Sequence, residues 1–275
     1  MIVAFIGLMV FDGWLDGSLT ISSADKPIQG TILSVLVAVL IIPAQWELGN
    51  LAAANGLKVF VPLTTVSSIL LATGWYWCQV LSIAPAACLV SVLVLSVLAI
   101  FLYQYAAYGT RGVFANCGAN CLVLCYAGLL GSSCVGIRVE FGVWPLLMFV
   151  FAVKSSDIGA YAVGTTIGRH KLAPVVSPKK TWEGLAGGMA ASAIVALLFG
   201  VVCDIMIWPL AVVFGLASAV IGQLGDLAES MLKRDAEQKD SSARVPGFGG
   251  VLDIVDSPLV VAPFAYLFFR IVASR

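Results

Sequence analysis

Residues 83–105 read IAPAACLVSVLVLSVLAIFLYQY, a run of 23 positions without a charged side chain. A helix needs about 20 mostly apolar residues to cross the hydrocarbon core of a bilayer. Every backbone N–H and C=O must then be satisfied within the segment, because lipid offers no hydrogen-bond partner. The run meets both conditions and predicts a transmembrane helix.

The same apolar character extends over the whole chain. Of its 275 residues, 60% are hydrophobic and 11% are charged, against roughly 45–50% and about 25% in an ordinary soluble domain. A mean hydropathy of +1.02 leaves too little polar side chain to cover a soluble core. Basic and acidic residues both number 15, so the net charge gives no reason to expect nucleic acid as a partner.

About nine stretches are apolar enough to be membrane helices. They lie near residues 1–12, 28–46, 59–77, 83–105, 118–136, 139–157, 185–203, 205–224 and 256–273. The first is too short to cross a bilayer, and we expect it to be the remainder of a helix that begins upstream. The predicted fold is an all-α, polytopic integral membrane bundle of about nine transmembrane helices in one continuous domain.

Two polar loops interrupt the second half of this domain. Each carries four basic residues, which are typical of cytoplasmic loops: Arg169, Lys171, Lys179 and Lys180 in the first, and Lys233, Arg234, Lys239 and Arg244 in the second. The loop after the first stretch has Asp12, Asp16 and Asp25 against Lys26, so we expect it on the outer side. Residues 1–140 then form a scaffold, and residues 141–275 carry the polar loops. Within the scaffold, Glu47 and Arg111 could line a polar pathway, but we expect them to reach the membrane interface.

The first polar loop begins at residue 154 with KSSDIGAYAVGTTIGRHKLAPVVSPKKTWEG. Asp157 ends an apolar span, where a carboxylate is costly unless it is functional or paired, and Lys154 is the available partner. The segment from Ser177 to Thr181 precedes a glycine-rich helix start, where hydroxyls, ammonium groups and unpaired N–H groups can hold phosphate. Alternatively, the lysines only set orientation and the glycines only permit close helix packing.

The second polar loop, from residue 222, reads GQLGDLAESMLKRDAEQKDSSARVPGFGGVLDIVDS. Spacings of three and four residues on a helix bring Asp226, Glu229 and Lys233 to one face. Asp253 and Asp256 form a second pair, able to face the first. Carboxylates of this kind, next to basic groups, suit Mg²⁺ and nucleotide phosphates. A solvated, internally paired loop is the alternative, but seven acids against four bases between residues 226 and 256 leave three acids unmatched.

Several strings resemble those of phosphatidate cytidylyltransferases. They are SMLKR at residues 230–234, KD at 239–240 and PGxGGxxDxxD at 246–256, with DIGAY and SPKKTWEG upstream. That family joins CTP to phosphatidic acid, releases pyrophosphate, forms CDP-diacylglycerol for phospholipid biosynthesis and depends on Mg²⁺. The resemblance implies a nucleotidyltransferase in the inner (cell) membrane, with residues 141–275 as its catalytic region and both loops in the cytoplasm.

Roles carry over by matching position. The resemblance implies catalytic roles for Asp226, Lys233 and Asp253; metal binding by Asp226, Asp253, Asp256 and Asp240; and substrate binding by Ser177, Lys179, Lys180, Thr181, Arg234, Lys239, Gly249 and Gly250. Two positions depart from the family pattern, since Phe248 stands where His is usual and Ile254 where Arg is usual.

Other functions fit parts of the same pattern. A CTP-dependent polyprenol or phytol kinase, or a CDP synthase acting on ether lipids, would keep the nucleotide site and change the lipid. A cation transporter would use Asp157 and Asp226 along a pathway. A homodimer is a further possibility, because Gly184 and Gly188 can pack helices within or between protomers.

Overall fold

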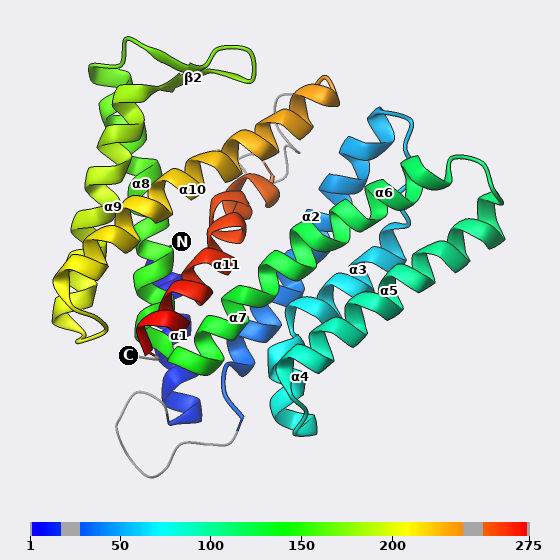
Figure 1. The fold of residues 1–275 in the computed structure, drawn as a ribbon, viewed down its shortest axis with the longest axis horizontal. Coiled ribbons are helices and arrows are strands. Elements are labelled where there is room, and N and C mark those ends of the chain that lie inside the picture. The colour runs from blue at the N-terminus through cyan, green and yellow to red at the C-terminus, as the bar shows by residue number, and fades with distance from the viewer. Residues whose placement is uncertain (1, 18–27, 239–249, 274–275) are drawn as a thin grey trace.

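The computed structural model describes residues 2–17, 28–238 and 250–273, which are mostly helical (Figure 1). The elements are α1 (Ile2–Asp16), α2 (Thr31–Ala54), α3 (Val61–Ala72), α4 (Gly74–Leu81), α5 (Pro85–Tyr108), α6 (Val113–Val123), the π-helix η1 (Leu124–Leu129), α7 (Leu130–Phe141), α8 (Val143–Thr166), β1 (Lys171–Ala173), β2 (Ser177–Thr181), α9 (Trp182–Val202), α10 (Trp208–Asp235) and α11 (Leu252–Ala273).

Seven of the described helical spans are long and apolar enough to cross a membrane, rather than the nine predicted. They are α2, α5, the continuous helix from α6 through η1 to α7, α8, α9, α10 and α11. The two remaining predicted stretches are also helical but short. The first forms the 15-residue α1, and the stretch 59–77 divides at Thr73 into α3 and α4.

The prediction of an all-α chain misses one small element. Strands β1 and β2 form an antiparallel hairpin in which Lys171 lies opposite Thr181 and Ala173 opposite Ser177. Helix α8 runs on to Thr166, nine residues past the predicted span, so only a short segment is left between α8 and α9. Figure 1 shows the hairpin at one end of the α8–α9 pair.

Helices α8 and α9 pack along each other through their glycines. A Cβ added at Gly159 would lie 2.7 Å from the carbonyl oxygen of Gly187, and one added at Gly188 would lie 2.9 Å from that of Ser156. Only residues without a side chain permit this approach. The glycines at the start of α9 therefore pack helices within one protomer, as the packing alternative proposed.

The largest apolar cluster surrounds α8. Met148, Phe149 and Ala152 of α8 are fully buried, with Phe214 of α10 and Ala265 of α11 in the same cluster. Figure 1 shows α10 and α11 between the α8–α9 pair and the layer that contains α2, α3, α5 and α7. The polar ends of α10 and α11 are thus positioned between the two halves of the bundle.

A buried ion-pair network corrects the prediction for the first loop. Asp12 and Asp16 belong to α1, not to a loop, and their carboxylates lie 2.9 and 2.5 Å from the guanidinium of Arg138, which has no solvent exposure. The same carboxylates accept the backbone N–H groups of Ile32 and Gly30. The network fixes α1 to α7 and to the start of α2, and sequence periodicity gave no sign of Arg138 as its centre.

Candidate functional site

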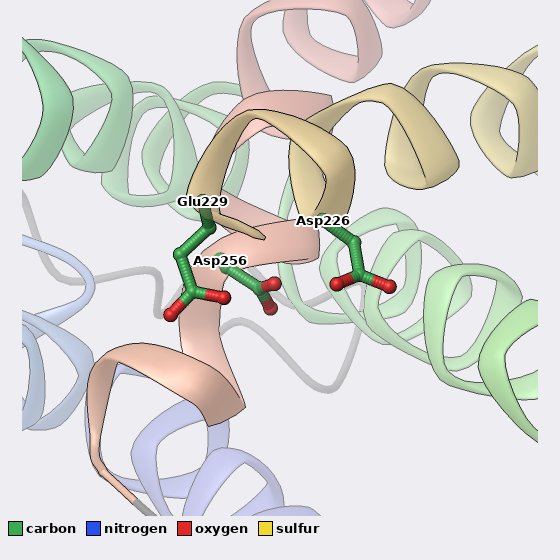
Figure 2. Close-up of side chains that lie close together, drawn as sticks. All are labelled: Asp226, Glu229 and Asp256. Carbon is green, nitrogen blue, oxygen red and sulfur yellow. The ribbon is translucent and has the colours of Figure 1, made fainter. Parts of the chain in front are cut away.

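Three carboxylates from α10 and α11 meet at one end of the bundle. One oxygen from each of Asp226, Glu229 and Asp256 can be chosen so that all three lie within 4.8 Å of one another. Figure 2 shows the first two side chains on α10 and the third on α11, all turned into one small volume. Glu229 and Asp256 are 1% and 4% exposed, so two of the three charges lie almost out of water.

The helices come close at this point because α10 has a glycine there. A Cβ added at Gly225 would lie 2.8 Å from Cβ of Val260 on α11, a distance that side chains do not reach without a shift of the backbone. The i, i+3 spacing then places Asp226 and Glu229 on the face of α10 that meets α11. Sequence and packing together bring the two helices' carboxylates into contact range.

Lys233 connects the two helices on the other side of Glu229. Its ammonium lies 2.8 Å from Glu229 Oε2 and 2.8 Å from Asp253 Oδ1. The second oxygen of Asp253 accepts the backbone N–H of Gly250 at 2.7 Å. Both oxygens of Asp253 thus have partners, and Asp253 lies beside the carboxylate group, not within it. Glu229 is a member of the group, although the predicted metal set did not include it.

The β-hairpin brings a second lysine to the cluster. Lys180 Nζ lies 2.5 Å from Asp226 Oδ2, and the side chain of Lys180 is only 16% exposed. The guanidinium of Arg234, near the end of α10, donates to the carbonyl oxygen of Val176 in the hairpin at 3.3 Å. The two polar segments predicted to lie on one side of the membrane therefore meet at one end of the molecule.

Helix α2 from the predicted scaffold also contributes to the site. The carboxylate of Glu47 accepts the backbone N–H of Val251 at 3.1 Å and that of Leu252 at 2.9 Å, and Glu47 is 1% exposed. An acid that takes up free N–H groups at a helix start is favourable for both hydrogen bonding and the helix dipole. Glu47 does not reach the membrane interface as predicted; it caps the helix that carries Asp253 and Asp256.

Lys154 does pair with Asp157, at 3.2 Å, as one of the two sequence interpretations proposed. The same ammonium donates to the carbonyl oxygen of Ile254 at 2.9 Å. A positive charge thus contacts the backbone at the position where the family resemblance implies an arginine. Asp157 and Lys154 belong to the edge of the site, not to an isolated pair.

The remaining predicted substrate-binding residues are placed as follows. The hydroxyl of Thr181 is buried and caps α9 by accepting the N–H of Gly184 at 3.1 Å. Lys179 is exposed on the hairpin, and Ser177 is partly buried in β2. Lys239, Asp240 and Gly249 lie outside the described residues, as does the departure at Phe248. Their predicted roles stay predictions.

The charges at the site favour a divalent cation. Among the described residues, five carboxylates, those of Asp157, Asp226, Glu229, Asp253 and Asp256, stand against the three ammonium groups of Lys154, Lys180 and Lys233 that contact them. This described set has an excess of two negative charges when ionised, and Glu229 and Asp256 lie almost out of water, where unpaired charge is costly. Carboxylate oxygens are the ligands that Mg²⁺ prefers, with remaining positions left for water and phosphate. The donor set therefore fits Mg²⁺.

Comparison with known proteins places the chain in a family. The profile of the cytidylyltransferase family matches residues 21–272. The chain is 39% identical over 156 residues to the phosphatidate cytidylyltransferase of Bacillus subtilis, covering 56% of this chain and 58% of that protein. It is 43% identical over 132 residues to that of Haemophilus influenzae, covering 45% and 46%, and 43% identical over 155 residues to that of Brucella suis, covering 55% and 57%. The chain thus spans about half the length of these relatives.

Proposed function

Because the chain belongs to the cytidylyltransferase family, we propose that it is a membrane-embedded phosphatidate cytidylyltransferase. It would convert CTP and phosphatidic acid into CDP-diacylglycerol and pyrophosphate. The observation that carries the proposal is the meeting of Asp226, Glu229 and Asp256 beside two half-buried lysines. The relatives named above supply the choice of phosphatidic acid as acceptor.

In this reaction a phosphate oxygen of phosphatidic acid attacks the α-phosphorus of CTP. A new P–O–P link forms, and the bond to the β-phosphate breaks, so that pyrophosphate leaves with the bonding electron pair. An ionised phosphate is already nucleophilic, so the chain needs no side-chain nucleophile. What the site must supply is orientation of two polyanions and compensation of the charge that develops on the leaving group.

The chain's own residues meet these needs as follows. Asp226, Glu229 and Asp256 would hold Mg²⁺, which when bound neutralises phosphate charge and orients phosphate oxygens. Lys180 and Lys233 each contact a carboxylate of this cluster. Either ammonium has further N–H donors and can turn toward a phosphate oxygen while remaining beside its carboxylate. Their low exposure strengthens these interactions relative to those in water.

The proposal explains why the polar site lies at the end of long apolar helices. Helix α10 has 28 residues and is about 42 Å long at 1.5 Å per residue, against about 30 Å for the hydrocarbon core. Its last turns can therefore reach the headgroup region, where a lipid phosphate and a soluble nucleotide can meet. We propose that this end faces the cytoplasm, in line with the basic residues of both loops.

The test is turnover by the purified full-length chain with CTP, phosphatidic acid in mixed micelles and Mg²⁺. Equal amounts of CDP-diacylglycerol and pyrophosphate are expected. A protein that is inert with phosphatidic acid, but consumes CTP with a polyprenol, would replace the proposal by a lipid kinase. Parallel assays with diacyl and ether-linked phosphatidic acid test the remaining alternative, a CDP synthase that acts on ether lipids.

A further inference from the structure

The helix that runs from Val113 to Phe141 contains an irregular turn. Residues Leu124–Leu129 form a π-helix between the regular helices α6 and α7. A π turn is rare, and where it occurs within an α-helix it frequently marks a functional site. It changes the direction in which its side chains project relative to the rest of the helix.

Neighbouring helices support this turn. Gln45 of α2 has no solvent exposure, and its amide nitrogen is 2.6 Å from Ser68 Oγ on α3 and 3.3 Å from the carbonyl oxygen of Val123, just before the turn. A Cβ added at Gly128 would lie 2.9 Å from Cα of Ser68. A buried polar anchor and a close helix contact therefore fix the π turn in place.

Tyr126 lies within the turn and points into the protein. It is 8% exposed and belongs to the apolar cluster that also contains Ala236, just after α10, and Leu252, the first residue of α11. Its hydroxyl is buried and has no hydrogen-bond partner among the described residues. Leaving a buried polar group without a partner costs about 1–3 kcal/mol, so a hydroxyl at such a place needs an explanation.

The surroundings of this hydroxyl supply one. The charged groups that act on Tyr126 are Asp256, Glu229 and Asp226, the three members of the carboxylate group. Both oxygens of Glu229 are buried without a well-aligned hydrogen bond among the described residues, although Oε2 lies 2.8 Å from the ammonium of Lys233. A buried donor without a partner thus lies within electrostatic range of the carboxylate group, as expected near a site arranged for a ligand that has oxygens.

We propose that Tyr126 is a substrate-contacting residue of this site, whose hydroxyl donates a hydrogen bond to a phosphate oxygen of the bound substrate. This inference rests on the proposed function and assigns an additional donor to the same site. A neutral donor stabilises a phosphate oxygen and leaves the net charge of the site unchanged. That net charge is determined by the carboxylates, the lysines and the cation. The π turn, which belongs to the predicted scaffold, is the element that positions this donor.

Tyr126→Phe is the test, because it keeps the buried ring in its apolar cluster and removes only the hydroxyl. The ligand-free variant is expected to melt at the same temperature as the wild type or higher, since an unpaired buried group is lost. Its kcat/KM with CTP and phosphatidic acid is expected to fall by about tenfold to a hundredfold. The rise in melting temperature on adding Mg²⁺ with inorganic pyrophosphate should also become smaller.

Tyr266→Phe is the matched control. Its hydroxyl donates to Glu140 at 2.9 Å, on a part of α11 far from the carboxylate group, so turnover and the response to pyrophosphate should not change. The proposal is overturned if Tyr126→Phe keeps wild-type kcat/KM, or if its ligand-free melting temperature drops while the pyrophosphate response stays normal. The pyrophosphate arm needs no turnover, so it decides the role of Tyr126 even if the wild type forms no CDP-diacylglycerol.

Discussion

Glu47 and Leu252 lie 205 positions apart in the chain, and the carboxylate of the first accepts the backbone N–H of the second at 2.9 Å. The contact joins the C-terminal part of α2 to the first turn of α11, one residue before Asp253 and four before Asp256. The orientation of these two carboxylates therefore depends on a helix that bears no predicted catalytic residue.

Replacing Glu47 by Leu should therefore affect both stability and turnover. The change leaves the N–H groups of Val251 and Leu252 without their acceptor, at a cost of about 1–3 kcal/mol, and releases the start of α11. We expect a lower melting temperature and a loss of activity of at least tenfold. Glu47→Gln keeps one carbonyl acceptor, so its melting temperature and its activity should lie between those of the wild type and those of Glu47→Leu.

Glu140→Gln serves as the control for this prediction. Glu140 contacts Tyr266 and Arg270 near the other end of α11, and the Arg270 side chain is 63% exposed. Exposed pairs of this kind contribute about 0–1 kcal/mol, so turnover should be normal. Wild-type stability and turnover in Glu47→Leu would show that the α2 contact does not position the site.

The two site lysines should differ in their effect on stability. Lys233→Met leaves Glu229 and Asp253 without their shared cation, and removing one member of a buried pair typically costs about 3–5 kcal/mol. Lys180→Met leaves Asp226, whose side chain is 37% exposed, so water can solvate it and the cost should be at most about 1 kcal/mol. Both variants should lose most of their turnover.

Melting temperature and initial rate, measured on the same preparations, check this pair. Lys180→Met should melt close to the wild type and be at least tenfold slower, while Lys233→Met should be deficient in both measurements. A fully active Lys180→Met would remove this lysine from the proposed mechanism and leave its ion pair with Asp226 as a structural contact.

The network around Arg138 predicts a stability effect away from the site. Arg138→Met removes the guanidinium that pairs with the buried Asp12 and Asp16, so the free energy of unfolding should fall by about 3–5 kcal/mol. Changing both acids to Asn in the same chain removes their charges and keeps an acceptor for the N–H groups of Gly30 and Ile32. The triple variant should therefore recover most of the lost melting temperature, and failure to recover would contradict this interpretation.

Local spacing predicted those parts of the site that depend on one helix. Intervals of three and four residues placed Asp226, Glu229 and Lys233 together, and the structure confirms that all three converge. The pairing of Lys154 with Asp157 follows from the same short-range logic. The helical, apolar character of all nine stretches was likewise readable from composition.

Contacts between distant segments could not be predicted in this way. The cap supplied by Glu47, the reach of Lys154 to Ile254 and the place of Tyr126 each depend on which apolar helix packs against which. Apolar faces are alike in sequence, so their pairing leaves no local pattern. The π turn that carries Tyr126 depends on Gln45 and Gly128 contacting other helices, which periodicity within one helix does not show.

The central claim is that Asp226, Glu229 and Asp256 hold the cation on which CTP:phosphatidate transfer depends. The most direct measurement is CDP-diacylglycerol formation by the wild type, Asp226→Asn and Asp256→Asn across a Mg²⁺ titration, with Mn²⁺ binding followed by paramagnetic resonance on the same proteins. We predict Mg²⁺-dependent turnover and Mn²⁺ binding in the wild type, with turnover reduced at least a thousandfold and Mn²⁺ binding lost in both variants. Wild-type turnover and Mn²⁺ binding in both variants would contradict the account.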